Sequence, residues 1–280
     1  MRLRAFSAFS CFLWGQAFQA PNSRISTTSK SFYNPSVIKM TEATVVESAR
    51  ASGLALQLDE GTRKSHSVAE NTAFVTGFFK GVSSREQFSR LVASLYFVYD
   101  CMEEAFDTCP DERVNALDYG SLRRKESLAE DMEFYFGPSW KETVSPSPAT
   151  KKYMKHIQNV SKSEPYLLVA HQYTRYLGDL FGGQMMGNMA RNSLGLHNEG
   201  GLGTRFYTFD SIKSTKQFIE EYYTKMNTLN FTEAEKEKIV EEANVVFRLN
   251  IELFDELEGN GFVSAIKIAF AAFKDKISGN

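Results

Sequence analysis

The sequence is best read outward from Leu167–Arg191, LLVAHQYTRYLGDLFGGQMMGNMAR. The stretch contains no proline and is rich in Leu, Met, Ala, Tyr and Arg, which predicts a helix. Four glycines nevertheless lie inside it: Gly178, Gly182, Gly183 and Gly187. Each glycine in a helix interior costs roughly 0.5–1 kcal/mol relative to alanine. We therefore expect the helix either to kink or to bring bare backbone close to something flat.

At about 100° per residue, a helix through this stretch places a small set of residues on one face. The set consists of His171, Arg175, Gly178, Asp179 and Gly182. One interpretation is close helix–helix packing, with Arg175 and Asp179 as an i,i+4 ion pair. The other is a ligand that lies against the backbone of the two glycines. A membrane GxxxG dimer face is disfavoured, because two charged residues lie in its middle.

Residues 170–184, AHQYTRYLGDLFGGQ, resemble the signature of the haem oxygenases, AHxYTRYLGDLSGGQ. The match is long and specific, and it favours the ligand interpretation. Phe181 stands where the signature has serine. His171 matches a structural hydrogen-bonding residue of the family. The other two histidines outside the motifs, His156 and His197, are expected to be exposed.

A second constellation is His66 with Glu70, one helical turn apart. A lone histidine on a helix is more often a surface or hydrogen-bonded residue, and an H-x-x-x-E pair is a weak metal signal. A neutral imidazole can nevertheless bind iron through one nitrogen while a carboxylate fixes the other. SHSVAENTAFVTGFFKG and REQFSRLVASLYFVYDCMEE resemble the family segment that carries the proximal haem histidine, and His66 is the matching position. RRKESLAEDMEFYFGPSW and NIELFDELEGN are similar to the cyanobacterial and plastid forms, so the resemblance runs from about residue 53 to residue 268.

The resemblance implies haem held between the His66 helix and the central helix. His66 would be the protein ligand to iron, and Gly178 and Gly182 would let the central helix lie over the ring. Asp179 would organise the proton supply. By family correspondence the remaining site residues are Tyr99, Arg175 and Asn250 in the same network, and Glu70, Tyr173, Gly183 and Phe247 beside haem.

The implied reaction opens haem to biliverdin, Fe(II) and CO, using O2 and electrons from reduced ferredoxin. The product would serve bilin pigments or phytochrome chromophores. The alternative is a scaffold that binds haem, or binds nothing, and has lost turnover. A third interpretation is a helical enzyme of another kind, one that uses a metal or thiamine chemistry. Such an enzyme would need a carboxylate-rich core or a catalytic cysteine, and neither stands out in the sequence.

Three substitutions favour the scaffold alternative, because the family grips the haem propionates with basic residues. Asp59, Ile219 and Tyr223 stand at the positions where Arg or Lys is expected. Each lost charge-assisted contact costs on the order of 1–3 kcal/mol if nothing replaces it. Tyr173 is retained among the propionate contacts. The candidates to compensate are the nearby basic residues Arg63, Lys213, Lys216 and Lys225.

The first forty residues differ in composition from the rest. The chain has 280 residues with 32 Lys and Arg and 34 Asp and Glu, and residues 1–40 hold five of the basic residues and none of the acidic ones. A basic, apolar start followed by a Ser/Thr-rich stretch is typical of a leader for an algal plastid, so we expect a stromal protein of residues 41–280. This part carries 27 basic against 34 acidic residues, about −7, which makes it a poor general binder of nucleic acid.

The mature chain reads as one all-α domain of roughly eight helices. The pattern predicts helices over 44–58, 62–80, 84–102, 126–136, 151–164, 214–229 and 232–257, besides the central one, with a short extended piece at 206–209. The loop SPSPAT occupies 145–150. Three cysteines without a CxxC pair argue against a disulfide or thiolate framework. No apolar run reaches the roughly 18 residues of a membrane span, and the amphipathic tail 262–277 is expected to pack on the domain without anchoring in a membrane.

Overall fold

The computed structural model describes residues 48–72, 75–77, 84–196 and 200–258. Every regular element in these ranges is helical, which confirms the predicted all-α class. Ten α-helices occur in the described part, more than the eight expected, because three of them are single turns of four residues. The leader, His197 and the tail 262–277 lie outside the described residues. The described residues from Ala49 to Glu258 belong to one compact unit.

The elements have the following bounds in chain order: η2 Ala49–Ala51, α2 Gly53–Glu70, α4 Arg85–Asp107, α5 Glu112–Asn115, η3 Gly120–Leu122, α6 Lys125–Phe136, α7 Trp140–Thr143, α8 Pro148–Ser163, η4 Pro165–Leu167, α9 Leu168–His171, η5 Gln172–Leu177, α10 Gly178–Leu194, η6 Arg205–Tyr207, α11 Thr215–Thr228 and α12 Glu233–Glu258. The segments labelled η are 3-10 turns, except η5, which is a π-helix. No helix among the described residues is both long and apolar enough to cross a membrane.

Local signals in the sequence begin and end these helices. Ser84 and Gln87 form a capping box at the start of α4. Thr232 and Glu235 exchange hydrogen bonds in the same way before α12. Gly137 ends α6 with a φ of 80°, a conformation that glycine adopts without strain.

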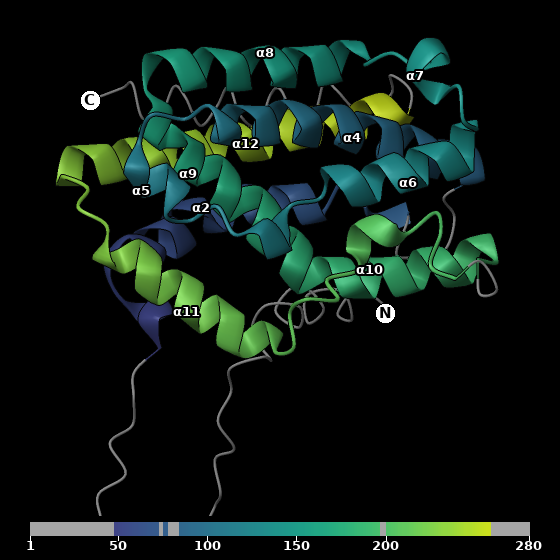
Figure 1. Ribbon diagram of the computed structural model, residues 1–280. Helices are drawn as coiled ribbons and strands as arrows, with labels where there is room; N and C mark the ends of the chain where they lie inside the picture. Colours follow the sequence, from purple (N-terminus) through teal and green to yellow (C-terminus); the bar gives the residue numbers. More distant parts are fainter. Residues whose placement is uncertain (1–47, 73–74, 78–83, 197–199, 259–280) are drawn as a thin grey trace, which may run out of the picture. The chain divides into compact units, whose positions relative to one another are not determined.

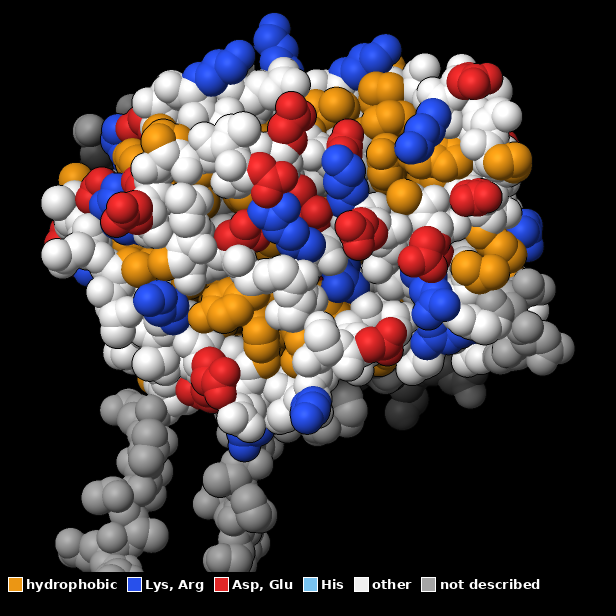
Figure 2. All heavy atoms as spheres, viewed as in Figure 1, with side chains coloured by type: hydrophobic (Ala, Val, Ile, Leu, Met, Phe, Trp, Pro, Cys, Tyr) orange, Lys and Arg blue, Asp and Glu red, His pale blue; other side chains and the backbone are white. Residues whose placement is uncertain are grey.

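Helix α12 organises the fold, since it packs against α2, α4, α8 and α9. Figure 1 shows α8 lying along α4 and α12. The core between these helices is filled by large apolar side chains, among them Leu58, Phe88, Met102 and Ile157. Charged side chains of both signs are interspersed with apolar ones on the face drawn in Figure 2.

Helix α2 runs unbroken through the position where the sequence predicts a gap between two helices. The predicted break between residues 58 and 62 was wrong because Gly61 serves packing, not termination. A Cβ atom at Gly61 would lie 2.3 Å from Cγ1 of Val240 in α12. Asn244 of α12 donates a hydrogen bond to the Gly61 carbonyl at 3.1 Å. The glycine therefore lets two helices approach closely.

Two shorter predictions also need correction. The expected extended piece at 206–209 is largely the 3-10 turn η6, whose first two N–H groups, those of Arg205 and Phe206, donate to the buried carboxylate of Asp131 at 2.9 Å. The expected SPSPAT loop is shorter than predicted. Ser147 caps α8 and Pro148 occupies its first position, which suits a residue without an N–H group.

The central stretch divides into α9, the π-helix η5 and α10. Its departure from α geometry lies at residues 172–177, just before the glycines. Gly183 and Gly187 both face Tyr207 of η6, and a Cβ atom added to them would lie 3.0 Å and 2.7 Å from its side chain. These two glycines therefore follow the packing interpretation.

Replacing Gly187 tests this close contact. Gly187→Ala places a methyl group 2.7 Å from Cβ of Tyr207, an atom that cannot move without its backbone. We expect a net loss of about 1–2 kcal/mol in the free energy of unfolding, because overpacking outweighs the gain in helix propensity. Gly182→Ala is the matched control in the same helix, and it should leave stability unchanged or slightly raised. Equal unfolding midpoints in denaturant for the two variants would contradict the packing role.

Candidate functional site

The first side of the candidate site is the His66 face of α2. Nδ1 of His66 lies 3.5 Å from a carboxylate oxygen of Glu70, and both side chains are about one quarter exposed. The ring of Phe247 in α12 meets the His66 ring edge-on, with centroids 5.6 Å apart. Glu70 can therefore fix the tautomer of His66, while Phe247 fixes the plane of the ring.

The second side is a polar network on the central helix. The Tyr99 hydroxyl donates a hydrogen bond to Oδ2 of Asp179. Arg175 reaches Oδ1 of the same carboxylate at 3.4 Å and donates to Oδ1 of Asn250 at 2.6 Å. Asn250 in turn donates to the Val246 carbonyl at 2.9 Å. The structure thus brings together the four residues that the sequence assigned to one network.

Burial dominates the electrostatics of this network. It raises the pKa of the Asp179 carboxyl well above its usual range, which favours a protonated side chain that can donate a proton or a hydrogen bond. Nε of Arg175 is buried and has no hydrogen-bond partner among the described residues. The Arg175 guanidinium also lies over the Tyr99 ring, 5.3 Å from its centroid. A polar ligand or a water at this point would satisfy the buried donor.

The glycines of α10 divide between two roles. A Cβ atom added to Gly178 or Gly182 would meet no atom of the described residues within 4 Å. Gly183 instead contacts Tyr207, so packing alone explains its lack of a side chain, and its expected part in haem binding stays a prediction. We call Gly178 and Gly182 the bare strip, because they leave the helix backbone uncovered beside Asp179.

Helix α12 links the two sides of the site. Phe247 and Asn250 are three residues apart and therefore share a helix face. Phe247 touches His66, while Asn250 holds Arg175. The imidazole on α2 and the buried carboxyl network therefore border the same stretch of α12.

The three positions with lost cations lie on α2 and α11, two helices that pack against each other. Ile219 and Tyr223 are fully buried on α11. Asp59 accepts hydrogen bonds from Arg50 and, at 3.3 Å, from Arg63. Of the four candidate replacements, only Arg63 makes this contact, while the lysines Lys213, Lys216 and Lys225 are exposed. Sequence reasoning missed Arg50, because nothing in its local sequence distinguishes it from any other charge before a helix.

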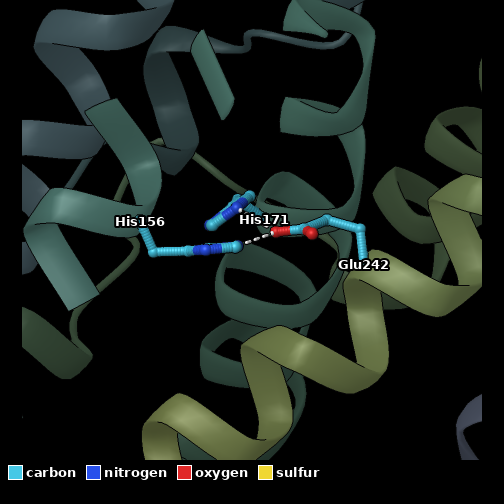
Figure 3. A group of neighbouring side chains, drawn as sticks. All are labelled: His156, His171 and Glu242. Atoms are coloured by element: carbon cyan, nitrogen blue, oxygen red, sulfur yellow. Dashed lines mark hydrogen bonds and ion pairs between the residues drawn. The ribbon is translucent and has the colours of Figure 1, made fainter. Parts of the chain in front are cut away.

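A third polar group, which we call the histidine triad, joins α8, α9 and α12. Figure 3 shows His156 pointing at the Glu242 carboxylate with His171 beside it, and Oε1 of Glu242 lies 2.6 Å from Nε2 of His156 and 3.0 Å from Nε2 of His171. His156 was expected to be exposed, but its side chain is only 29% exposed and contacts Glu242. The predicted hydrogen-bonding part of His171 is confirmed.

The triad is also the set of described residues whose side chains could gather around a metal, with ligand atoms within 4.8 Å of one another. Tetrahedral zinc keeps its ligand atoms about 3.3 Å apart, from Zn–N and Zn–O distances of about 2.0–2.1 Å. The separations of 2.6 Å and 3.0 Å are those of hydrogen bonds. We therefore interpret the triad as a structural clamp on the helix that leads into the site.

The triad should make stability depend on pH. Burial alone would raise the pKa of Glu242, but hydrogen bonds from His156 and His171 lower it to about 2. Because folding lowers the pKa, the stabilisation is full above the unfolded value of about 4.5 and is lost as pH falls towards 2. Glu242→Gln should therefore cost about 3 kcal/mol in unfolding free energy at pH 7 and progressively less below pH 4.5.

Denaturant unfolding at several pH values measures this difference. Glu252→Gln is the matched control, since Glu252 also joins α12 to α8, through the more exposed Lys152. The control should lose less than about 1 kcal/mol at any pH. A loss in Glu242→Gln that stays constant from pH 7 down to about pH 2.5 would contradict the account.

Comparison with known proteins identifies what this arrangement is similar to. The family model described as "Heme oxygenase" matches residues 52–256. Heme oxygenase 1 of Synechocystis is 45% identical over 216 residues, covering 77% of this chain and 88% of the relative. The heme oxygenase of Rhodella violacea is 40% identical over 227 residues, covering 81% and 95%. The crystal structure of heme oxygenase-1 from the cyanobacterium Synechocystis in complex with heme has a TM-score of 0.71 at 44% identity, covering 79% of this chain and 100% of that one.

Proposed function

Because the chain belongs to the haem oxygenase family, we propose that it binds haem as its substrate and opens the ring to biliverdin, Fe(II) and CO. The observation that carries the proposal is the bare strip at Gly178 and Gly182 beside the buried carboxyl network. A flat ring can lie against uncovered backbone, and a protonated carboxyl next to it can supply protons. The heme complexes of the two Synechocystis relatives support haem as the ligand.

The residues present fit haem on both sides. His66 offers Nε2 as a ligand to iron, with Nδ1 directed at Glu70. On the other side, the bare strip admits the ring, and the buried Nε of Arg175 lacks a partner among the described residues. Haem, when bound, supplies the iron that activates O2 and the ring that reacts.

The chain's own part in the reaction is to hold and move protons. Burial raises the pKa of the Asp179 carboxyl, which favours the form that carries a proton. Tyr99 and Arg175 contact both oxygens of that carboxyl and fix its orientation. Asn250 holds Arg175 from α12, so the proton donor cannot swing away. A positioned general acid of this kind contributes about 10²–10⁴-fold to a rate.

The scaffold function remains the second candidate, and a specific observation favours it. Asp59, Ile219 and Tyr223 leave the expected cations missing at the positions that matched the propionate grip. The intact network of Tyr99, Asp179, Arg175 and Asn250 argues for turnover, because a scaffold has no need for a buried, oriented proton donor.

The partner and the compartment are part of the same proposal. We propose reduced ferredoxin as the electron donor and the plastid stroma as the location, with bilin or phytochrome chromophore synthesis as the use of the product. The acid-free, Ser/Thr-rich composition of residues 1–40 supports the plastid. With a formal charge of about −7 for the remainder, an acidic donor would have to dock on a local basic patch.

A turnover assay tests the proposal. The protein with one equivalent of haemin, O2 and reduced ferredoxin should lose its Soret absorbance while biliverdin appears. Asp179→Asn should bind haemin with the same Soret spectrum yet form biliverdin at least tenfold more slowly, since it lacks the proton donor. Asp210→Asn, an exposed acid, is the control and should match the unmodified protein.

The other outcomes decide between the candidates. A stable Soret band in the unmodified protein would favour the scaffold. An absent Soret shift on adding haemin would contradict haem binding, and an undiminished rate in Asp179→Asn would contradict the role of the carboxyl.

A further inference from the structure

Four polar side chains from four different elements meet where the expected cations are missing. Arg50 lies on η2, Asp59 on α2, Tyr173 on η5 and Tyr223 on α11. The Arg50 guanidinium donates a hydrogen bond to Oδ1 of Asp59, and both side chains are about one fifth exposed. Elements η2, α2 and α11 pack against one another. Burial is the main reason that the pKa of Tyr173 and of Tyr223 is raised, and the charges of Asp59 and Arg50 act on both hydroxyls in addition, as expected of groups that lie near one another.

The segment that carries Arg50 is held firmly against α11. The Ala49 N–H donates to a carboxylate oxygen of Glu220 at 3.0 Å, and Asn227 donates to the Ala49 carbonyl at 2.7 Å. The side chain of Asn227 also accepts from the N–H of Ala55, at 3.0 Å, so it ties this segment to the start of α2. Arg50 is therefore positioned by the fold before any ligand arrives.

Tyr223 supplies an independent observation that points to a ligand. Its side chain is 1% exposed, and its hydroxyl has no hydrogen-bond partner among the described residues. A buried hydroxyl without a partner is costly, so a ligand oxygen at this point would be favourable. Burial raises the pKa of this hydroxyl, which keeps it a donor at neutral pH.

The charges of the group suit an anionic ligand in spite of the acidic residue. Asp59 contacts two guanidinium groups, those of Arg50 and Arg63, so the three together carry one net positive charge. A guanidinium has five N–H donors and can serve two carboxylates at once. The resemblance implies a basic residue at position 59. Asp59 instead binds Arg50, and the Arg50 guanidinium supplies the positive charge.

We propose that Arg50, oriented by Asp59, binds a propionate carboxylate of haem together with the hydroxyls of Tyr173 and Tyr223. This inference rests on the proposed function. Arg50 precedes the family match, which begins at residue 52. The proposed contact therefore comes from a residue that the family model does not cover. Tyr223 then acts as a hydrogen-bond donor where the resemblance implies a charge.

A binding titration with two ligands tests the proposal without turnover. Haemin and its dimethyl ester share the ring and the iron, but the ester lacks the carboxylate charges. The unmodified protein should bind haemin at least tenfold more tightly than the ester, as measured from the Soret band. Arg50→Gln should lose about tenfold in haemin affinity and keep its affinity for the ester, while Arg50→Lys should retain part of the preference.

Arg90→Gln is the matched control, because Arg90 is an exposed arginine of α4 that donates to the Glu256 carbonyl. It should bind both ligands as the unmodified protein does. If Arg50→Gln weakens both ligands equally, or neither, the proposal is wrong while the haem oxygenase function stands. If the unmodified protein binds neither ligand, the proposed function fails and this inference fails with it.

Discussion

Close contact between glycine backbone and the Tyr207 side chain is the constraint on which the rest of the site depends. Gly183 and Gly187 allow α10 to lie against η6, and η6 is in turn held by the buried carboxylate of Asp131. This contact fixes the position of α10 and therefore of Gly178 and Gly182, which leave their stretch of backbone uncovered. Helix α10 thus uses Gly183 and Gly187 for packing, while Gly178 and Gly182 leave its backbone open to a ligand.

Much of this could be predicted from the sequence, because the relevant signals are local. Capping residues such as Ser84 and Thr232 gave the starts of α4 and α12, and helical periodicity put Arg175 and Asp179 on one face. The resemblance to haem oxygenases added Tyr99 and Asn250, which lie on other helices and could not be joined to the network by spacing. The structure brings all four together, and their catalytic parts stay a prediction.

The remainder depended on contacts between distant segments, which single-sequence patterns do not carry. The helix break predicted between residues 58 and 62 is absent, because Gly61 there meets Val240, which lies far away in the sequence. His156 looked like a surface residue until α12 brought Glu242 to it. Arg50 gained its significance only because η2 folds back onto α2 beside Asp59. In each case the role of the residue is determined by a neighbour from a distant part of the chain and not by the local sequence.

The central claim is that the bare strip receives haem, and a single substitution tests it most directly. Gly182→Leu fills the uncovered space with a good helix former and touches no described atom at its Cβ position. The account predicts an unfolding midpoint equal to or slightly above that of the unmodified protein, together with at least a tenfold loss of haemin affinity in a Soret titration. Unchanged haemin affinity in a stably folded Gly182→Leu protein would contradict it.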